Sequence, residues 1–141
     1  MTDDAVDLHR SLSANVIALD WHEEIGALRS SASYASADHS ARTLAKHPAM
    51  RLVLVAMKSG GRMEEHHTDS AITVQCLEGR LHFEVGGATH DLVPGHFLVV
   101  TERLPHSVVA IEECAFLLTI GEQRRTQERA VEDEAMAKDE P

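Results

Sequence analysis

The chain has 141 residues, of which 43% are hydrophobic, and a formal net charge of −10. This length suffices for one domain with a single core. The negative charge argues against nucleic acid or an anionic membrane surface as a partner, because both attract basic proteins. Uncharged apolar runs such as residues 52–57 have the length of a strand, and no run approaches the roughly 20 residues of a membrane-spanning helix.

The N-terminal residues and the cysteines bear on the compartment. Asp3 and Asp4 stand near the start without a basic segment and an apolar core, so we expect no signal peptide and a cytoplasmic protein. Cys76 and Cys114 lie in apolar strand patterns, which predicts small buried side chains in a reducing compartment. A disulfide bond or a reactive thiol is the alternative interpretation.

Residues 1–40 are interpreted as an N-terminal helical segment and a connector. Residues 7–29 carry a helical period, with Val16 and Leu19 on one line, which predicts one helix or two shorter helical pieces. Trp21 is expected to pack this helical segment onto the barrel. Residues 30–36 are rich in serine and alanine, which predicts a connector that adds nothing to the core.

From residue 41 to residue 121 the pattern changes to short strands. Leu81, Phe83 and Val85 alternate with polar residues, as in a half-buried strand. The following Gly86-Gly87 predicts a two-residue hairpin turn, which requires positive φ. Residues 97–101 have the composition of a buried strand. The predicted strands are 43–46, 51–57, 62–67, 71–77, 81–85, 89–92, 97–101, 107–111 and 115–120.

Short strands at such regular spacing predict an all-β sandwich or barrel, not a parallel sheet. The composition changes again after Gly121. Residues 122–141 hold seven acidic and four basic residues with few apolar ones, which predicts an acidic tail that is helical or disordered.

Histidines stand near both ends of the strand-rich region. His66 and His67 are adjacent, and His106 follows Leu104-Pro105 some forty residues later. Only a barrel that folds these segments together would place their imidazoles in one cavity. Imidazole is a ligand suited to zinc, copper, iron and nickel.

The order of glycine turns and histidines resembles the cupin superfamily, and within it the small single-domain bacterial cupins. The segment from Gly60 through His66 to Gly79 resembles the first cupin motif, and the segment from Gly95 to His106 resembles the second. The runs GRLHFEVGG, PGHFLVV, LPHSV and AFLLTI strengthen the likeness over residues 43–120. The resemblance implies a double-stranded β-helix, or jelly-roll barrel, and pairing into a homodimer.

The resemblance also implies a metal site, from which this sequence departs. The acidic ligand of the first motif would fall on Ile72, whose hydrocarbon side chain cannot bind a cation, unless Gln75 substitutes through a shifted register. The histidine pair is irregular, because His66 would pair with Thr68 in the motif or His67 with Glu65. Adjacent strand residues point to opposite faces, so His66 and His67 reach one metal only through a bulge.

The candidate metal ligands are His66, His67, Gln75 and His106, which would hold one divalent transition metal: Fe, Mn, Ni, Cu or Zn. Histidines that hydrogen-bond each other or water without a metal are the alternative. His82 is expected on a second face or in solvent. His90 and His96, which flank turns, are expected at the surface.

Two functions follow from the resemblance, and both stay open. The first is a metal-dependent oxygenase, isomerase or decarboxylase acting on a small organic substrate. The second is a ligand-binding or sensing barrel without turnover or a working metal site, which the missing acidic ligand favours. Whether the protein is an enzyme is therefore undecided at this point.

Overall fold

The computed structural model describes residues 16–66, 69–101 and 104–121, with the backbone alone for residues 65 and 66. Strands dominate, as the sequence predicts. The elements are α2 (Trp21–Arg29), α3 (Ala32–Ala35), β1 (His39–His47), β2 (Met50–Met57), β3 (Arg62–His66), β4 (Ile72–Glu78), β5 (Leu81–Val85), β6 (Ala88–Leu92), β7 (Phe97–Val100), β8 (His106–Ala110) and β9 (Cys114–Gly121).

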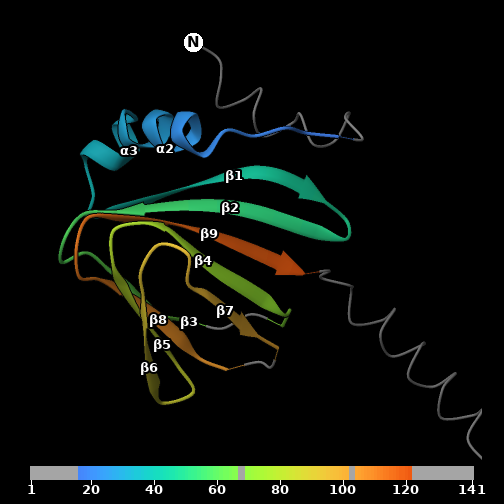
Figure 1. Ribbon diagram of the computed structural model, residues 1–141, viewed down its shortest axis with the longest axis vertical. Helices are drawn as coiled ribbons and strands as arrows, with labels where there is room; N and C mark the ends of the chain where they lie inside the picture. The colour runs from blue at the N-terminus through green and yellow to red at the C-terminus, as the bar shows by residue number, and fades with distance from the viewer. Residues whose placement is uncertain (1–15, 67–68, 102–103, 122–141) are drawn as a thin grey trace, which may run out of the picture.

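The strands form two antiparallel sheets that face each other (Figure 1). The five-stranded sheet has the order β1-β2-β9-β4-β7, and the four-stranded sheet has the order β3-β8-β5-β6. Strands from the beginning and the end of the barrel are neighbours, since β2 pairs with β9 and β3 pairs with β8. This crossing of early and late strands confirms the predicted jelly-roll barrel.

The main core lies between the two sheets. Every second residue of β4, β5 and β8 points inward, as the alternating sequence predicts. Phe83 and Phe116 are each 1% exposed, and each such side chain contributes on the order of 1.5–3 kcal/mol by leaving water. The other buried members are Val55, Met57, Ile72, Val74, Cys76, Leu81, Val85, Leu92, Val100, Val108, Ala110, Cys114 and Ile120.

A second core covers the outer face of the five-stranded sheet. Helices α2 and α3 lie over β1 and β2 (Figure 1), and Ile25 and Leu28 pack there on buried Leu54. Trp21 is half-buried against this cluster, which confirms its predicted role. An ion pair of 2.6 Å between Arg29 and Glu78 ties the end of α2 to β4.

The prediction of a connector at residues 30–36 was wrong. Helix α3 lies there, and the side chain of Ser31 accepts a hydrogen bond from the Tyr34 N–H at its start. Tyr34 is only 6% exposed, and its hydroxyl donates to Glu113 at 3.0 Å. A single aromatic residue therefore makes this serine-rich piece part of the second core, because its ring has no other apolar surface to cover.

The helix predicted over residues 7–29 begins later. Residues 16–20 are not helical, and residues 1–15 lie outside the described part. Asp20 is the N-cap of α2, with its carboxylate accepting from the backbone N–H of His22 at 2.9 Å. A cap of this kind satisfies N–H groups that have no partner within the helix, and so determines where it starts.

Two strands also differ from prediction. β1 begins at His39, so the barrel starts inside the expected connector. The run 97–101 does not form a buried strand, because Phe97 and Val99 of β7 are 56% and 57% exposed. β7 is the edge of its sheet, and α2 and α3 cover the opposite edge. Among the described residues, no helix has the length and apolar character to cross a membrane, and cytoplasmic location stays a prediction.

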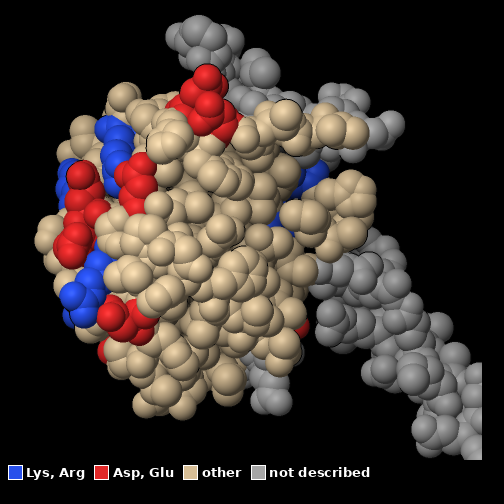
Figure 2. Space-filling view, in the orientation of Figure 1, with Lys and Arg blue, Asp and Glu red and all other residues tan. Residues whose placement is uncertain are grey.

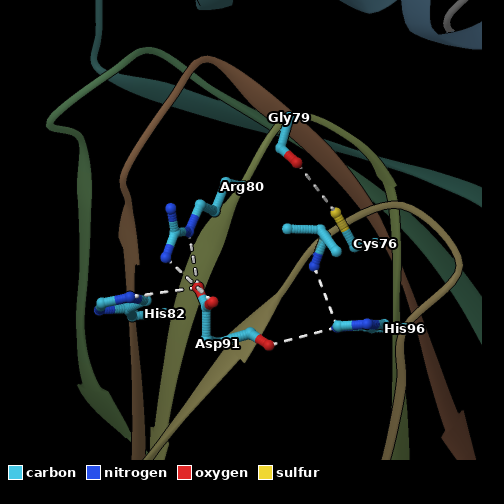
Figure 3. Close-up of polar contacts among 7 residues, drawn as sticks. Cys76, Gly79, Arg80, His82, Asp91 and His96 are labelled. Atoms are coloured by element: carbon cyan, nitrogen blue, oxygen red, sulfur yellow. Dashed lines mark hydrogen bonds and ion pairs between the residues drawn. The ribbon is translucent and has the colours of Figure 1, made fainter.

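The two cysteines are free and buried, as predicted. Burial raises the pKa of the Cys76 thiol to about 11 and that of Cys114 to about 12. The Cys76 Sγ lies 3.6 Å from the Glu78 carbonyl oxygen and 3.7 Å from that of Gly79 (Figure 3). Both thiols are therefore neutral core groups and poor nucleophiles at neutral pH.

The turn at Gly86-Gly87 confirms the hairpin prediction, and a second glycine turn, at Gly79, lies close to the start of β9. Gly86 and Gly87 have φ values of 59° and 82°. Gly79 has φ +76°, and a Cβ built there would overlap the Glu113 carbonyl oxygen and lie 2.8 Å from the Cys114 Cα. The β4–β5 turn therefore packs backbone to backbone on the start of β9, which only glycine permits.

We predict that Gly79→Ala lowers the free energy of unfolding by about 3 kcal/mol or more, because backbone strain and a steric overlap add together. Gly87→Ala is the matched control, since its φ is also positive and nothing lies within 4 Å of the added Cβ. The control should lose only about 1–2 kcal/mol. Urea unfolding measures the free energy of unfolding of the two variants. Equal losses in Gly79→Ala and Gly87→Ala would contradict the close approach at Gly79.

The raised thiol pKa values predict a loss of stability at alkaline pH. Thiols in the unfolded chain ionise near 9.0, whereas the folded ones stay protonated to about 11 and 12. The contribution of the two buried thiols to the free energy of unfolding is complete below pH 9. It is lost as the pH rises through the pKa values of the folded state. The Cys76→Ala/Cys114→Ala variant should therefore show a shallower fall in unfolding free energy above pH 9. Tyr34, whose pKa burial also raises, contributes equally to both proteins, and identical slopes would refute the prediction.

Candidate metal and ligand site at the barrel mouth

His106 is the first residue of β8 and points into the barrel. It is 4% exposed, and it alternates with buried Val108 and Ala110 along the strand. Its ring stacks on Phe83 with 5.4 Å between centroids and an angle of 18° between planes. An imidazole held in this way on an apolar wall has one defined orientation toward the barrel interior.

A second contact determines which nitrogen of His106 carries the proton. Its Nδ1 lies 3.3 Å from the backbone carbonyl oxygen of Leu104. A carbonyl oxygen only accepts, so in the neutral ring Nδ1 carries the proton and Nε2 has the lone pair. Metal-binding histidines commonly use this arrangement, in which a backbone carbonyl sets the tautomer and the orientation of the ring.

The backbone register places His66 directly opposite His106 in the β3–β8 ladder. Met63 pairs with Val108, so three steps along β3 match two along β8, and a bulge lies between Met63 and His66. In a regular ladder Glu65 would stand opposite His106. This bulge lies before His66 and places His66, not Glu65, opposite His106. The bulge that would let His66 and His67 face one metal stays a prediction, because His67 lies outside the described residues.

We call the end of the barrel formed by the start of β4, the start of β8 and the end of β9 the barrel mouth. Its described inner residues are His106 and a group of apolar side chains: Ile72, Val85, Val100 and Ile120. Ile72 is 2% exposed and lies between Val100 and Ile120 in the ladders. The position of the expected acidic ligand is therefore filled by hydrocarbon packed in the core.

The structure does not bring Gln75 to this site. Ile72 and Val74 point into the barrel, so Gln75 points to the outer face of β4. There it lies between Phe97 of β7 and Leu117 of β9. The ladder between β4 and β9 is regular through this region, so the register shift that would turn Gln75 inward is not observed.

The remaining predicted ligands lie partly beyond the described chain. His67 and Thr68 are outside it, and only the backbone of Glu65 and His66 is described. Within the described residues, no three His, Cys, Asp or Glu side chains converge as a metal site would require. The donor chemistry at the mouth is imidazole without a described carboxylate, which suits a transition metal rather than calcium or magnesium.

His82 and His96 lie on the outside of the barrel, whereas His90 stands opposite inward-facing Phe83 in the β5–β6 ladder and is half-buried. His82 Nε2 is 3.3 Å from a carboxylate oxygen of Asp91, which also accepts from Arg80 at 2.8 Å (Figure 3). The hydrogen bond from Arg80 lowers the pKa of the Asp91 carboxyl. His96 is exposed, and its Nδ1 lies 3.3 Å from the Asp91 carbonyl oxygen. These contacts link β5, β6 and the turn after β6, at a distance in the fold from the mouth.

Comparisons with known proteins agree with this geometry. The profile of a family described as "Cupin domain" matches residues 53–121. A search of curated proteins finds no significant match. Many solved structures are similar, among them an RmlC-like cupin from Shewanella frigidimarina (18% identity, 62% of this chain and 79% of the other, TM-score 0.58) and KdgF from Halomonas sp. (20%, 64% and 84%, 0.56).

A variant of oxalate decarboxylase from B. subtilis is also similar, at 21% identity over 65% of this chain and 27% of that one, with a TM-score of 0.57. Identities this low establish a common fold and leave the activity open. The matched residues run from β2 to the end of β9 and include His66 and His106. The protein therefore contains a small domain of the cupin superfamily.

Proposed function

We propose that the barrel mouth binds one divalent transition metal through His66, His67 and His106, and a small organic ligand beside it. The observation that carries the proposal is the cross-strand pair of His66 with His106, whose tautomer and orientation are set by Leu104 and Phe83. A bound metal would act as a Lewis acid or lower the pKa of a bound water. Iron, manganese, nickel, copper and zinc all accept such a ligand set.

The apolar side chains of the mouth indicate the kind of ligand. Val85, Val100 and Ile120 offer a hydrocarbon surface next to His106. Neutral imidazoles leave the charge of a divalent ion uncompensated, because Ile72 replaces the expected carboxylate. Such a centre favours a small anion with an apolar body, such as a carboxylate or an enolate. The similarity to oxalate decarboxylase, named for a carboxylate substrate, supports a carboxylate as the ligand.

A ligand-binding or sensing barrel without metal is the second candidate. The buried Ile72 favours it, since hydrocarbon fills the position where a carboxylate ligand is expected. In that case His106 Nε2 would accept a hydrogen bond from the ligand, and the contacts of the ring with Phe83 and Leu104 would orient it for that bond. The two candidates differ in whether a metal is required for ligand binding.

We predict near-stoichiometric metal in native protein purified without a histidine tag. His66→Ala and His106→Ala should each lower the metal content at least about tenfold, because each removes one of few ligands. His82→Ala, a histidine on the outer side of β5, is the matched control and should keep native metal content. Elemental analysis after reconstitution with each of the five metals gives the measurement.

Circular dichroism spectra of each variant distinguish a defect in folding from the loss of a metal-binding side chain. Metal that is absent from native protein after every reconstitution would refute the metal centre and leave the second candidate. Metal retained equally by His66→Ala, His106→Ala and His82→Ala would place it elsewhere on the chain.

We also propose that two copies pair through the uncovered part of the five-stranded sheet. β7 is an edge strand with the sequence FLVV, which lacks the charged residues that usually protect an edge. Phe97 and Val99 stand more than half exposed on its outer side. The face of the molecule over β4 and β7 shows few charged side chains, whereas such residues gather along its left margin (Figure 2). The partner with a matching apolar edge is a second copy.

We predict that Phe97→Asp/Val99→Lys converts a dimer into a monomer, because it adds charges to both exposed positions of β7. Val16→Asp is the control, since Val16 is 86% exposed and lies before α2. Light scattering coupled to size-exclusion chromatography measures the mass. A native monomer, or a variant that remains dimeric, would exclude pairing through β7.

A further inference from the structure

A pocket of about 180 Å³ lies beside the hairpin that joins β1 to β2. Figure 1 shows this hairpin on the right, next to the end of β9. His106 does not line the pocket, although Ile120 belongs both to the pocket and to the barrel mouth. It is lined by Lys46, His47, Pro48, Met50, Arg51, Ile120 and Gly121.

The polar lining of this pocket is cationic or donates hydrogen bonds. Lys46 and Arg51 stand directly opposite each other in the β1–β2 ladder. Two cations side by side in a ladder attract an anion to the position between them. None of the described residues that line the pocket is acidic, although the chain carries a net charge of −10.

His47 supplies a third donor. The backbone N–H of Ala49 donates to His47 Nδ1 at 3.0 Å. Nδ1 therefore acts as an acceptor, and the proton of the neutral ring is on Nε2. His47 can thus donate from Nε2 without a change in charge, while the hairpin turn holds its ring in place.

The rest of the lining is hydrocarbon. Met50 is 39% exposed, and Ile120 lines the pocket while also belonging to the barrel core. A pocket of this size whose lining combines cations with aliphatic groups fits a short aliphatic chain that ends in an anion. Arginine binds a carboxylate with two parallel hydrogen bonds, and lysine adds a point charge.

We propose that this pocket binds a carboxylate group through Lys46, His47 and Arg51. The carboxylate comes either from a free small acid or from the chain itself. Residues 122–141 follow directly on Gly121, which lines the pocket, and contain seven aspartates and glutamates. Both sources use the same chemistry, and neither requires the metal centre.

The test uses propionate as the probe and the imidazole NMR signals of His47 as the readout in the full-length protein. Their assignment comes from a His47→Asn variant. The first test variant is Lys46→Gln/Arg51→Gln. Its matched control is Lys58→Gln/Arg62→Gln, which changes the charge by the same amount beyond the other end of β2. A second test variant carries amides in place of all seven acidic residues of 122–141.

If the source is a free acid, propionate shifts the His47 signals of the native protein to saturation. Lys46→Gln/Arg51→Gln then weakens binding by roughly tenfold or more, and the control variant binds as the native protein does. If the chain's own carboxylates fill the pocket, the native protein does not respond and the amide variant does. Both results support the proposal.

The proposal is overturned if neither the native protein nor the amide variant responds. It is also overturned if the two charge variants respond alike, or if inorganic phosphate shifts the signals where propionate does not. Amide spectra of each variant confirm that the fold is intact, so that loss of binding is not loss of structure. The metal content is unaffected in every case, which separates this outcome from that of the metal centre.

Discussion

Burial of both faces of the five-stranded sheet is the constraint on which the rest of this structure depends. Phe116 of β9 lies in the barrel, whereas its neighbour Leu117 lies under the helices. A strand with apolar residues on both faces needs a packed element against each face. The four-stranded sheet supplies one, and α2 with α3 supplies the other, anchored by the ion pair of Arg29 with Glu78. The incomplete second cover leaves β7 exposed, which makes it the natural place for a partner.

The barrel that results has chemically different ends. The end at Gly79 is closed by backbone packing on Glu113 and Cys114 and holds two neutral thiols. At the mouth, β3 and β8 end their pairing with His66 opposite His106. A single bulge decides that a histidine and not Glu65 takes this position. His106 at the mouth is the one buried imidazole among the described residues.

Both proposed sites would attract anions to a protein that is strongly acidic. The mouth does so through a metal without a described carboxylate ligand, and the hairpin pocket through Lys46, His47 and Arg51. Local potentials at a concave surface depend on nearby groups more than on net charge. An acidic protein can therefore bind acids where its cations gather.

The sequence by itself determined the barrel, because alternation in β4, β5 and β8 and the turn at Gly86-Gly87 are local signals. It also indicated His106 as an inward residue. Only tertiary structure decided that Gln75 points outward, that Tyr34 belongs to a core and that Phe97 is exposed. A strand's period of two shows which residues share a face. Which face is buried depends on elements distant in the chain, and no local pattern contains that information.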